Sequence, residues 1–432
     1  MAILETGCPC GRVHRYDNDV IIGNGVIDRI GEVVDRFGAE KIYLLCDNNT
    51  WKAAASEVFN RLSDKTVVCH RFENEHLEPD EYAIGSAVTH FPFDADLILT
   101  VGSGVLNDIG KVVAATAHKP YVIVATAPSM DGYASDNSSL IRDGIKVSLN
   151  TVGANVVIGD IDILKKAPMN MLKAGLGDIL AKYISLCDWR ISHHVVGTYY
   201  CAEVAQMIRD VLKRCVDNAE GLLRREDKAV RAVFEAMVIS GIAVTYAGIS
   251  CPVSGVEHYI SHVIDMRAVE FGTPMDLHGI QCAVGTYLAL QMYDRICHTT
   301  PDPDKARAYV AAFDKTAWHN RLRELLGSAA EGMIELDKKE NKYDPATHEQ
   351  RLARIMDWEP IVAIMNEELP ETEAIRKLLD LLEMPKSVEE LGTDKALLPD
   401  IIRATKDIRD KYVTSRLAFD LGVLDEILEE IK

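Results

Sequence analysis

Three residues far apart in the sequence carry groups that bind divalent metals: Asp178 in Ala-Gly-Leu-Gly-Asp, His258 in Ser-Gly-Val-Glu-His, and His278 in Asp-Leu-His-Gly. One carboxylate and two imidazoles can hold an ion and leave coordination positions open for a substrate oxygen. That open set distinguishes a catalytic metal site from a closed structural one. A single histidine in an apolar helix is more often a core or surface residue. If the three side chains converge, the sequence predicts a metal-assisted enzyme.

A further imidazole, His262, lies four residues after His258 and therefore shares its helix face. Glu257 precedes this pair, so the segment is not the His-Glu-x-x-His motif of metalloproteases. We therefore expect a metal-dependent reaction other than peptide hydrolysis.

The N-terminal segment holds a separate group of possible ligands, Cys8, Cys10 and His14. Cys-x-Cys is an uncommon spacing for zinc, and no fourth ligand is evident from the sequence. Two interpretations stay open: part of a small structural metal site, or side chains that fill the core. The ten cysteines are spread along the chain without dense spacing, which indicates reduced thiols rather than a disulfide framework.

Composition narrows the class of protein and its partners. The chain has 432 residues, 48% of them hydrophobic and 26% charged, which predicts a globular protein of two or three domains. No stretch approaches a membrane span and the N-terminus lacks a signal peptide, so we expect a cytoplasmic protein. The net charge of −19 opposes nucleic acids and anionic membranes as partners. A small anionic substrate in a local basic pocket stays compatible with it.

The elements that must position these residues change in type along the chain. Up to about residue 165, short β-branched runs alternate with helical patterns, which predicts a mostly parallel sheet with helices on its faces. Beyond residue 160, helical patterns continue almost to the C-terminus. We therefore expect an α/β domain over 1–165 and an all-α domain over 166–432. The expected strands are 20–22, 41–46, 67–72, 97–101 and 121–125, and the expected helices are 25–38, 49–62, 79–90 and 104–117.

A glycine-rich turn follows the fourth expected strand. Ligands of parallel sheets bind where strands end and helix N-termini face an anion. Gly102, Ser103 and Gly104 therefore predict a pyrophosphate site, with Asp108 in the helix that follows. Gly-x-Gly also fits a plain tight turn, and the Gly-x-Gly-x-x-Gly fingerprint is not complete.

Two other strand ends carry candidate ligand-binding groups. Asp47 ends the second strand, where its carboxylate either binds the adenosine ribose and favours NAD over NADP, or caps the next helix. The loop 126–135 follows the fifth strand and contains Thr126, Ser129 and Asp131. Small hydroxyl groups and one carboxylate suit contacts with polyols and phosphates.

Taken in order, these motifs resemble the sn-glycerol-1-phosphate dehydrogenases. That family belongs to the superfamily of metal-dependent alcohol dehydrogenases, glycerol dehydrogenases and dehydroquinate synthases. The likeness extends from about residue 18 to the C-terminal helices and is strongest over 100–285. The matching stretches are Gly102-Ser-Gly-Val-Leu-Asn-Asp108, the loop 126–135, Gly175-Leu-Gly-Asp178, His258-x-x-x-His262 and His278-Gly279.

The resemblance implies a dehydroquinate synthase-like fold and an NAD(P)-dependent enzyme that interconverts dihydroxyacetone phosphate and sn-glycerol-1-phosphate. It assigns Asp178, His258 and His278 to Zn²⁺ or Ni²⁺. It places Asp131 beside the substrate hydroxyls and His262 beside the substrate or in proton relay, and it suggests a homodimer or larger assembly. The residues that it places around the cofactor are Gly102, Ser103, Gly104, Asp108, Thr126 and Ser129.

The substrate is less well specified by the sequence. Basic residues near the motifs, namely Arg142, Lys146, Lys182 and Arg267, could bind a phosphate, but each is also typical of a solvated surface cation. One alternative is a dehydrogenase of unphosphorylated polyols such as glycerol. Another is a dehydroquinate-synthase-like lyase, which needs a denser basic cluster. A non-catalytic binding protein would contain neither metal nor cofactor.

Overall fold

The computed structural model describes residues 7–74, 76–142 and 145–431. The chain forms two compact units, Met1–Ile179 with Gln206–Gly248, and Leu180–Ala205 with Ile249–Lys432. All strands of the described residues belong to the first unit, and every element after β8 is a helix. The mostly parallel α/β region and the helical C-terminal part are therefore confirmed. The division at residue 165 into an α/β domain and an all-α domain stays a prediction.

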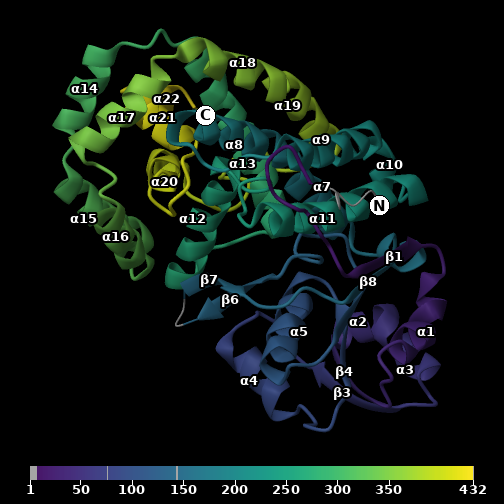
Figure 1. Ribbon diagram of the computed structural model, residues 1–432. Coiled ribbons are helices and arrows are strands. Elements are labelled where there is room, and N and C mark those ends of the chain that lie inside the picture. The colour runs from purple at the N-terminus through teal and green to yellow at the C-terminus, as the bar shows by residue number, and fades with distance from the viewer. Residues whose placement is uncertain (1–6, 75, 143–144, 432) are drawn as a thin grey trace. The chain divides into compact units, whose positions relative to one another are not determined.

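A six-stranded parallel sheet forms the centre of the first unit (Figure 1). Its strands lie in the order β1-β8-β5-β4-β2-β3, and a separate antiparallel hairpin is formed by β6 and β7. The five expected strands are present, whereas β8 and the hairpin were not expected. The strands are β1 (Asp19–Gly23), β2 (Lys41–Asp47), β3 (Thr66–Phe72), β4 (Leu97–Gly102), β5 (Tyr121–Ala125), β6 (Asn137–Arg142), β7 (Ile145–Asn150) and β8 (Val156–Asp160).

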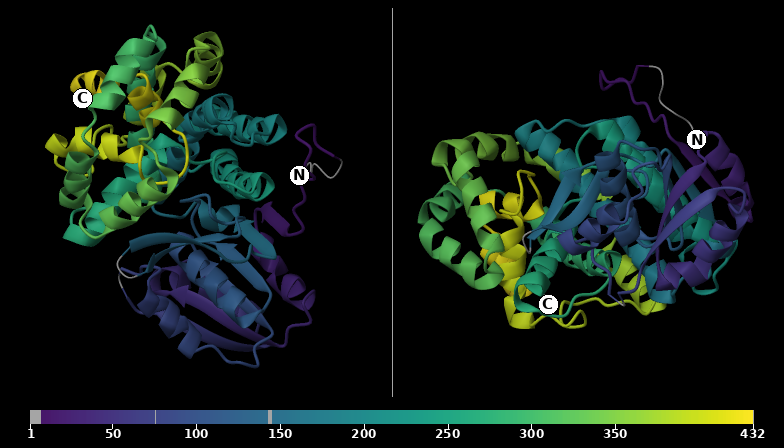
Figure 2. Two further views of the ribbon diagram at one scale, coloured as in Figure 1. Left: turned by 60° about the vertical axis from the view of Figure 1, so that its left-hand side comes forward. Right: turned by 90° about the horizontal axis from the view of Figure 1, so that it is seen from below.

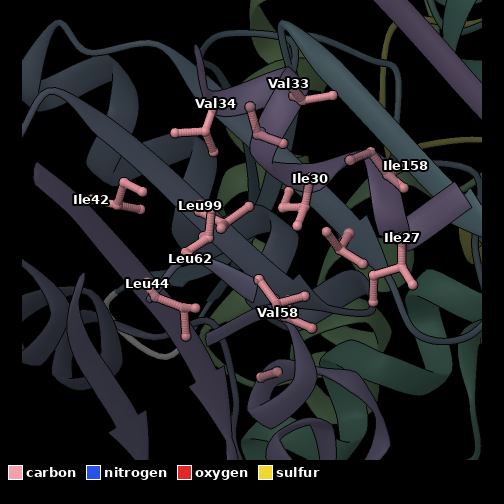
Figure 3. Packing of buried hydrophobic residues seen from close by; sticks show 14 of the residues in the cluster. Ile27, Ile30, Val33, Val34, Ile42, Leu44, Val58, Leu62, Leu99 and Ile158 are labelled. Atoms are coloured by element: carbon pink, nitrogen blue, oxygen red, sulfur yellow. The ribbon is translucent and has the colours of Figure 1, made fainter. Parts of the chain in front are cut away.

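Helices cover both faces of this sheet, which explains why β4, β5 and β8 are buried at every position. On one face, Ile30 of α1, Val58 of α3 and Leu99 of β4 belong to one buried cluster (Figure 3). On the other face, the Tyr43 hydroxyl donates to the Ala87 carbonyl of α4 at 2.7 Å. The helices with all their residues in this unit are η1 (Val26–Arg29), α1 (Ile30–Asp35), α2 (Asn48–Thr50), η2 (Trp51–Ala55), α3 (Ser56–Arg61), α4 (Glu81–Thr89), α5 (Gly104–Ala117), α6 (Ile161–Leu164), α10 (Ala219–Leu223) and α11 (Asp227–Ala247).

The order of the strands indicates where a sheet of this kind binds a ligand. From β2 the chain continues to β3 on one side, whereas from β4 it continues to β5 and then β8 on the other side. The carboxyl ends of β2 and β4 therefore flank the topological switch point, where open α/β sheets bind ligands. Asp47 ends β2 and Gly102 ends β4. Two residues predicted to bind the cofactor thus lie on either side of this switch point.

Helix α11 differs from the expectation that no stretch of the sequence approaches a membrane span. Within the described part of the chain, it alone is long and apolar enough to cross a membrane by length and composition. However, 72% of its apolar window is buried inside the protein. Phe234 of α11 packs directly on Gly159 of β8, where a Cβ atom would lie 2.0 Å from the Phe234 ring. These contacts are those of a core helix.

The second unit is built around the helix pair α12 (Val256–Phe271) and α13 (His278–Cys297). Gly285 of α13 lies where the two helices cross, and a Cβ atom there would be 2.4 Å from the Glu257 carbonyl oxygen. The absence of a side chain therefore permits this close approach. Figure 2 shows these helices from two further sides. The remaining helices are α8 (Lys182–Val196), α14 (Pro303–Ala312), α15 (Lys315–Leu326), α16 (Ala329–Glu340), α17 (Pro345–Ile355), α18 (Trp358–Glu368), α19 (Thr372–Leu381), η3 (Lys395–Leu397), α20 (Leu398–Thr405), α21 (Thr414–Asp420) and α22 (Leu424–Glu430).

Candidate active site

Three histidines from two separate sequence motifs lie close together between α12 and α13. The ring centroids of His258 and His278 are 5.1 Å apart. The ring of His262 lies 6.4 Å from His258 and 6.0 Å from His278, and it is nearly parallel to the latter. His258 is buried, whereas His262 and His278 are half-buried. The fold of the second unit therefore gathers imidazoles that are up to 20 positions apart in the chain.

Polar partners orient both predicted ligand histidines. Glu257 Oε1 lies 2.7 Å from Nδ1 of His258, and Ser261 Oγ lies 3.1 Å from Nδ1 of His278. A histidine held through Nδ1 presents Nε2 to a metal ion. The same Glu257 oxygen accepts the Gly255 N–H at 2.8 Å, which fixes the carboxylate at the start of α12. These partners are of the kind that orient histidines in metal sites.

Buried carboxylates make the region behind His258 electronegative. Glu257 is fully buried, and Asp188 of α8 is almost so. Asp188 accepts the Val256 N–H at 2.8 Å and the Thr414 hydroxyl at 2.6 Å. Burial, and then the charge of Glu257, raise the pKa of Asp188 to about 7. A cation at Nε2 of His258 would offset this negative charge, so the donor set fits a divalent metal.

Cys282 is a candidate ligand that the sequence analysis missed. It lies one turn after His278 in α13, and its Sγ is 3.5 Å from Nε2 of His278. The ligand atoms of His258, His278 and Cys282 all lie within 4.8 Å of one another. Burial opposes ionisation of this thiol, but His258 and His278 outweigh it and lower the pKa of Cys282. The i, i+4 spacing from His278 was the available signal.

In the first unit, the structure brings together Asp131 and Asp178. Asp178 lies in α7 (Met169–Leu180) and is fully buried, and its Oδ2 accepts the Asp131 N–H at 3.0 Å. Gly175, one turn earlier, passes under the same loop, because a Cβ atom there would lie 1.9 Å from the Pro128 carbonyl oxygen. The motif 175–178 therefore holds the loop that carries Asp131.

The glycine turn after β4 has a packing role in addition to its predicted binding role. A Cβ atom at Gly102 would lie 2.5 Å from Cδ1 of Leu106, and one at Gly104 would lie 3.0 Å from Cγ of Met130. Ser103 makes no side-chain cap to the 14-residue helix α5. The Ser103 side chain therefore does not satisfy the first amides of this helix, where an anion site is predicted.

Asp47 caps a helix, which was one of the two roles expected for it. Its Oδ1 accepts the Thr50 N–H at 2.7 Å, and its own N–H donates to Thr50 Oγ1 at 2.9 Å. These two bonds form a capping box at the start of α2. Because the Asp47 side chain is half-exposed at the switch point, contact with a ribose stays a prediction.

A buried lysine holds the loop 126–135 against α5. Lys111 donates hydrogen bonds to the carbonyl groups of Gly132 and Asn137, the latter at 3.0 Å. Burial lowers the pKa of this lysine. At the start of the loop, the Thr126 N–H donates to the Gly102 carbonyl at 3.1 Å. Two further residues predicted to border the cofactor, Asp108 and Ser129, are also buried.

Three of the basic residues considered for phosphate binding have described side chains, and each of the three has different surroundings. Arg142 is exposed in the β6–β7 hairpin, and the side chain of Lys146 lies outside the described part of the chain. Lys182 is fully buried in α8. Arg267 donates to the Leu325 carbonyl and lies over the Phe271 ring, 5.2 Å from its centroid. The phosphate-binding residues therefore stay a prediction.

Replacing Glu257 with glutamine is expected to weaken zinc binding by about 10–100-fold, the usual effect of losing an outer-shell partner. The amide can still accept a hydrogen bond from His258, but the negative charge behind the imidazole is lost. Competition with a chelator of known zinc affinity measures the change. Glu270→Gln is the matched control, because Glu270 is exposed near the other end of α12. Equal affinities in the two variants would contradict the role given to Glu257.

Comparison with known proteins gives consistent results. Residues 21–168 match the family of iron-containing alcohol dehydrogenases. The glycerol-1-phosphate dehydrogenase [NAD(P)+] of Bacillus subtilis (strain 168) is 30% identical over 283 residues, which cover 64% of this chain and 72% of that protein. The enzyme of the same name from Geobacillus stearothermophilus is 27% identical over 414 residues, covering 94% and 93%.

A solved structure supports the fold. The crystal structure of glycerol dehydrogenase from Schizosaccharomyces pombe matches with a TM-score of 0.63 and 17% identity, over 97% of this chain and 91% of that chain. At this identity the likeness shows a shared fold.

Proposed function

This chain belongs to the glycerol-1-phosphate dehydrogenase family of NAD(P)- and metal-dependent alcohol dehydrogenases, and we propose that it interconverts dihydroxyacetone phosphate and sn-glycerol-1-phosphate. Family membership makes it an oxidoreductase, so a non-catalytic binding role is set aside. The observation that carries the proposal is the pair His258 and His278, whose ring centroids lie 5.1 Å apart and whose Nδ1 atoms are held by Glu257 and Ser261.

We assign Asp178, His258 and His278 as the ligands of one divalent ion, Zn²⁺ or Ni²⁺. The buried carboxylate of Asp178 and the two oriented imidazoles are the donor types that these ions accept. Three protein ligands leave a position for the substrate, so Cys282 is given no ligand role. When bound, the ion and the reduced nicotinamide supply charge stabilisation and the hydride.

The chain's own side chains then orient the substrate and move the proton. His262 delivers a proton to the substrate oxygen, directly or through water, as the hydride adds to the carbonyl carbon. Its half-buried ring, which stacks on His278, supports this role. Asp131 accepts hydrogen bonds from the substrate hydroxyls. The bond from its N–H to Asp178 supports this role, because it couples the substrate loop to a proposed metal ligand.

We place NAD(P)H across the switch point between β2 and β4, with its pyrophosphate at the N-terminus of α5. The start of α5, which the Ser103 side chain does not cap, and the half-exposed residue Asp47 support this placement. The carboxylate would accept bonds from the ribose hydroxyls and repel a 2′-phosphate, which favours NADH. The other residues assigned to the cofactor are Gly102, Ser103, Gly104, Asp108, Thr126 and Ser129.

The two roles of Asp47 can be separated by two substitutions. Asp47→Asn keeps a good N-cap but removes the charge, whereas Asp47→Ala removes both. In each variant we expect the ratio of kcat/KM for NADPH to that for NADH to rise about tenfold, equivalent to about 1.4 kcal/mol of lost repulsion. Only Asp47→Ala should also lower the free energy of unfolding, by about 1 kcal/mol. If the ratio of kcat/KM values stayed unchanged in both variants, Asp47 would have only its capping role.

The substrate is tested by turnover of the metal-loaded enzyme with dihydroxyacetone phosphate and with dihydroxyacetone, using NADH and NADPH. We expect preference for the phosphorylated triose and loss of activity on chelation. Faster turnover of dihydroxyacetone would favour a polyol dehydrogenase instead. A dehydroquinate-synthase-like lyase would consume its own substrate without net oxidation of the nicotinamide, and absence of turnover with both trioses would reject the proposal.

Location and assembly complete the proposal. All ten cysteines are free thiols, which supports a location in the reducing cytoplasm. We further propose a homodimer or larger assembly. Sedimentation of the purified protein at several concentrations measures this directly, and a monomer throughout would contradict it.

A further inference from the structure

A second group of metal-binding side chains lies in the loop before β1. Sγ of Cys10 is 3.2 Å from Nε2 of His14. The ligand atoms of Cys8, Cys10 and His14 all lie within 4.8 Å of one another. Cys8 and His14 are buried, and Cys10 is half-buried. Two thiols and an imidazole this close together in space are ligand types that zinc accepts.

The backbone of this loop is shaped to direct its ligands inward. The Gly11 N–H donates to the Cys8 carbonyl at 2.9 Å, and the Cys8 N–H donates to the Arg12 carbonyl at 3.2 Å. Gly11 has a φ of +83°, a conformation that favours glycine. The chain therefore turns tightly between the two cysteines and the histidine, as a loop around one ion requires.

The C-terminal end of α11 anchors the loop. The Arg12 guanidinium donates to the Ala247 carbonyl at 2.7 Å. The His14 ring stacks on Tyr246, with centroids 5.1 Å apart. The ligand loop is thus held at residues 246–247 rather than lying loosely on the surface.

Helix α11, which receives the loop, is held in turn by the part of α9 (Ala202–Asp217) that belongs to the same unit. The Cys215 thiol donates to the Ala232 carbonyl of α11 at 3.3 Å, and Arg214 pairs with Glu235 at 3.0 Å. The loop is therefore anchored on a packed helix.

We propose that Cys8, Cys10 and His14 bind a zinc ion that ties the N-terminal segment to the end of α11. Two thiolates and an imidazole are softer donors than the carboxylate and two imidazoles assigned to the catalytic ion. The site is therefore chemically distinct from the one assigned to the catalytic ion. It does not depend on the proposed substrate or reaction.

Elemental analysis of the full-length protein, purified from zinc-supplemented cells, tests this proposal. Cys8→Ser and Cys10→Ser are each expected to lose one zinc ion per chain and to keep the ion at the histidine site. Cys297→Ser is the matched control, because Cys297 is a half-buried thiol at the end of α13 and this variant should keep both ions. Wild-type zinc content in Cys8→Ser or in Cys10→Ser would overturn the proposed site. His278→Ala should lose only the other ion, so the two sites are assessed separately.

A second measurement uses the unaltered protein and so does not depend on the folding of a variant. A zinc-bound thiolate is shielded from iodoacetamide, whereas a free thiol is alkylated. We expect Cys10 to resist alkylation in the zinc-loaded protein and to react after chelation, as read by peptide mass spectrometry. Cys297 should react equally before and after chelation. Equal reactivity of Cys10 in the two states would overturn the proposal.

Discussion

Replacing His278 with alanine is expected to lower turnover of dihydroxyacetone phosphate by at least about a thousandfold, because a catalytic metal stabilises the transition state by several kcal/mol. The expected loss follows from the position of His278 at the start of α13, where its ring centroid lies 5.1 Å from that of His258. Asp178→Ala should have a comparable effect, since it removes the proposed carboxylate ligand. Steady-state rates and bound metal, measured on the same preparations, give both readouts.

The same helix offers a control for the His278 substitution. His298 is exposed and caps the other end of α13, which has 20 residues and therefore separates the two positions by about 30 Å. His298→Ala should retain full turnover and bound metal. Thermal unfolding of both variants checks that the fold is kept. Wild-type turnover of His278→Ala or Asp178→Ala under strict chelation would reject the metal assignment.

Replacing Gly285 with alanine is expected to have the second largest effect, on stability and on metal binding together. The new Cβ atom would lie 2.4 Å from the Glu257 carbonyl oxygen, so backbone rather than a flexible side chain must move. Overpacking of this kind costs about 1–3 kcal/mol. The displaced segment carries Glu257 and His258, and we therefore expect zinc affinity to fall about tenfold or more, as when an outer-shell contact is lost.

Gly332 provides the matched control in the same unit. It lies inside α16, and a Cβ atom there meets no other atom within 4 Å. Gly332→Ala should therefore raise the free energy of unfolding by up to about 1 kcal/mol, through helix propensity alone, with zinc affinity unchanged. Chemical denaturation and chelator competition compare the two variants. If Gly285→Ala behaved like Gly332→Ala, close packing of α12 and α13 would not position the histidines.

These two experiments address different parts of the same site. His278 supplies a donor atom, whereas Gly285 supplies only the room that brings two helices together. A loss of metal binding in both variants would show that ligand chemistry and helix packing are each necessary. Glu257 connects these two contributions. Its carboxylate orients His258, and its carbonyl oxygen is the atom that a Cβ atom at Gly285 would meet most closely.

The sequence alone determined the classes of element and the chemistry that they carry. Alternating β-branched and helical patterns predicted the parallel sheet, and the five expected strands all appear in the structure. His258, His262 and His278 were identified by residue type and spacing, and they do meet. Such features are local, because helix and strand periods and the donor atoms of a side chain depend on a few neighbouring residues.

Only the tertiary structure decided which distant groups act together. The switch point between β2 and β4 depends on strand order, which no single segment encodes. Cys282 became a candidate ligand because the packing of α12 on α13 brings His258 close to its thiol as well as to His278. Asp47 suited a cap and a ribose contact equally well until the Thr50 bonds showed the cap. The order of the strands and the approach of His258 to His278 arise from packing between whole elements, and local sequence patterns therefore do not specify them.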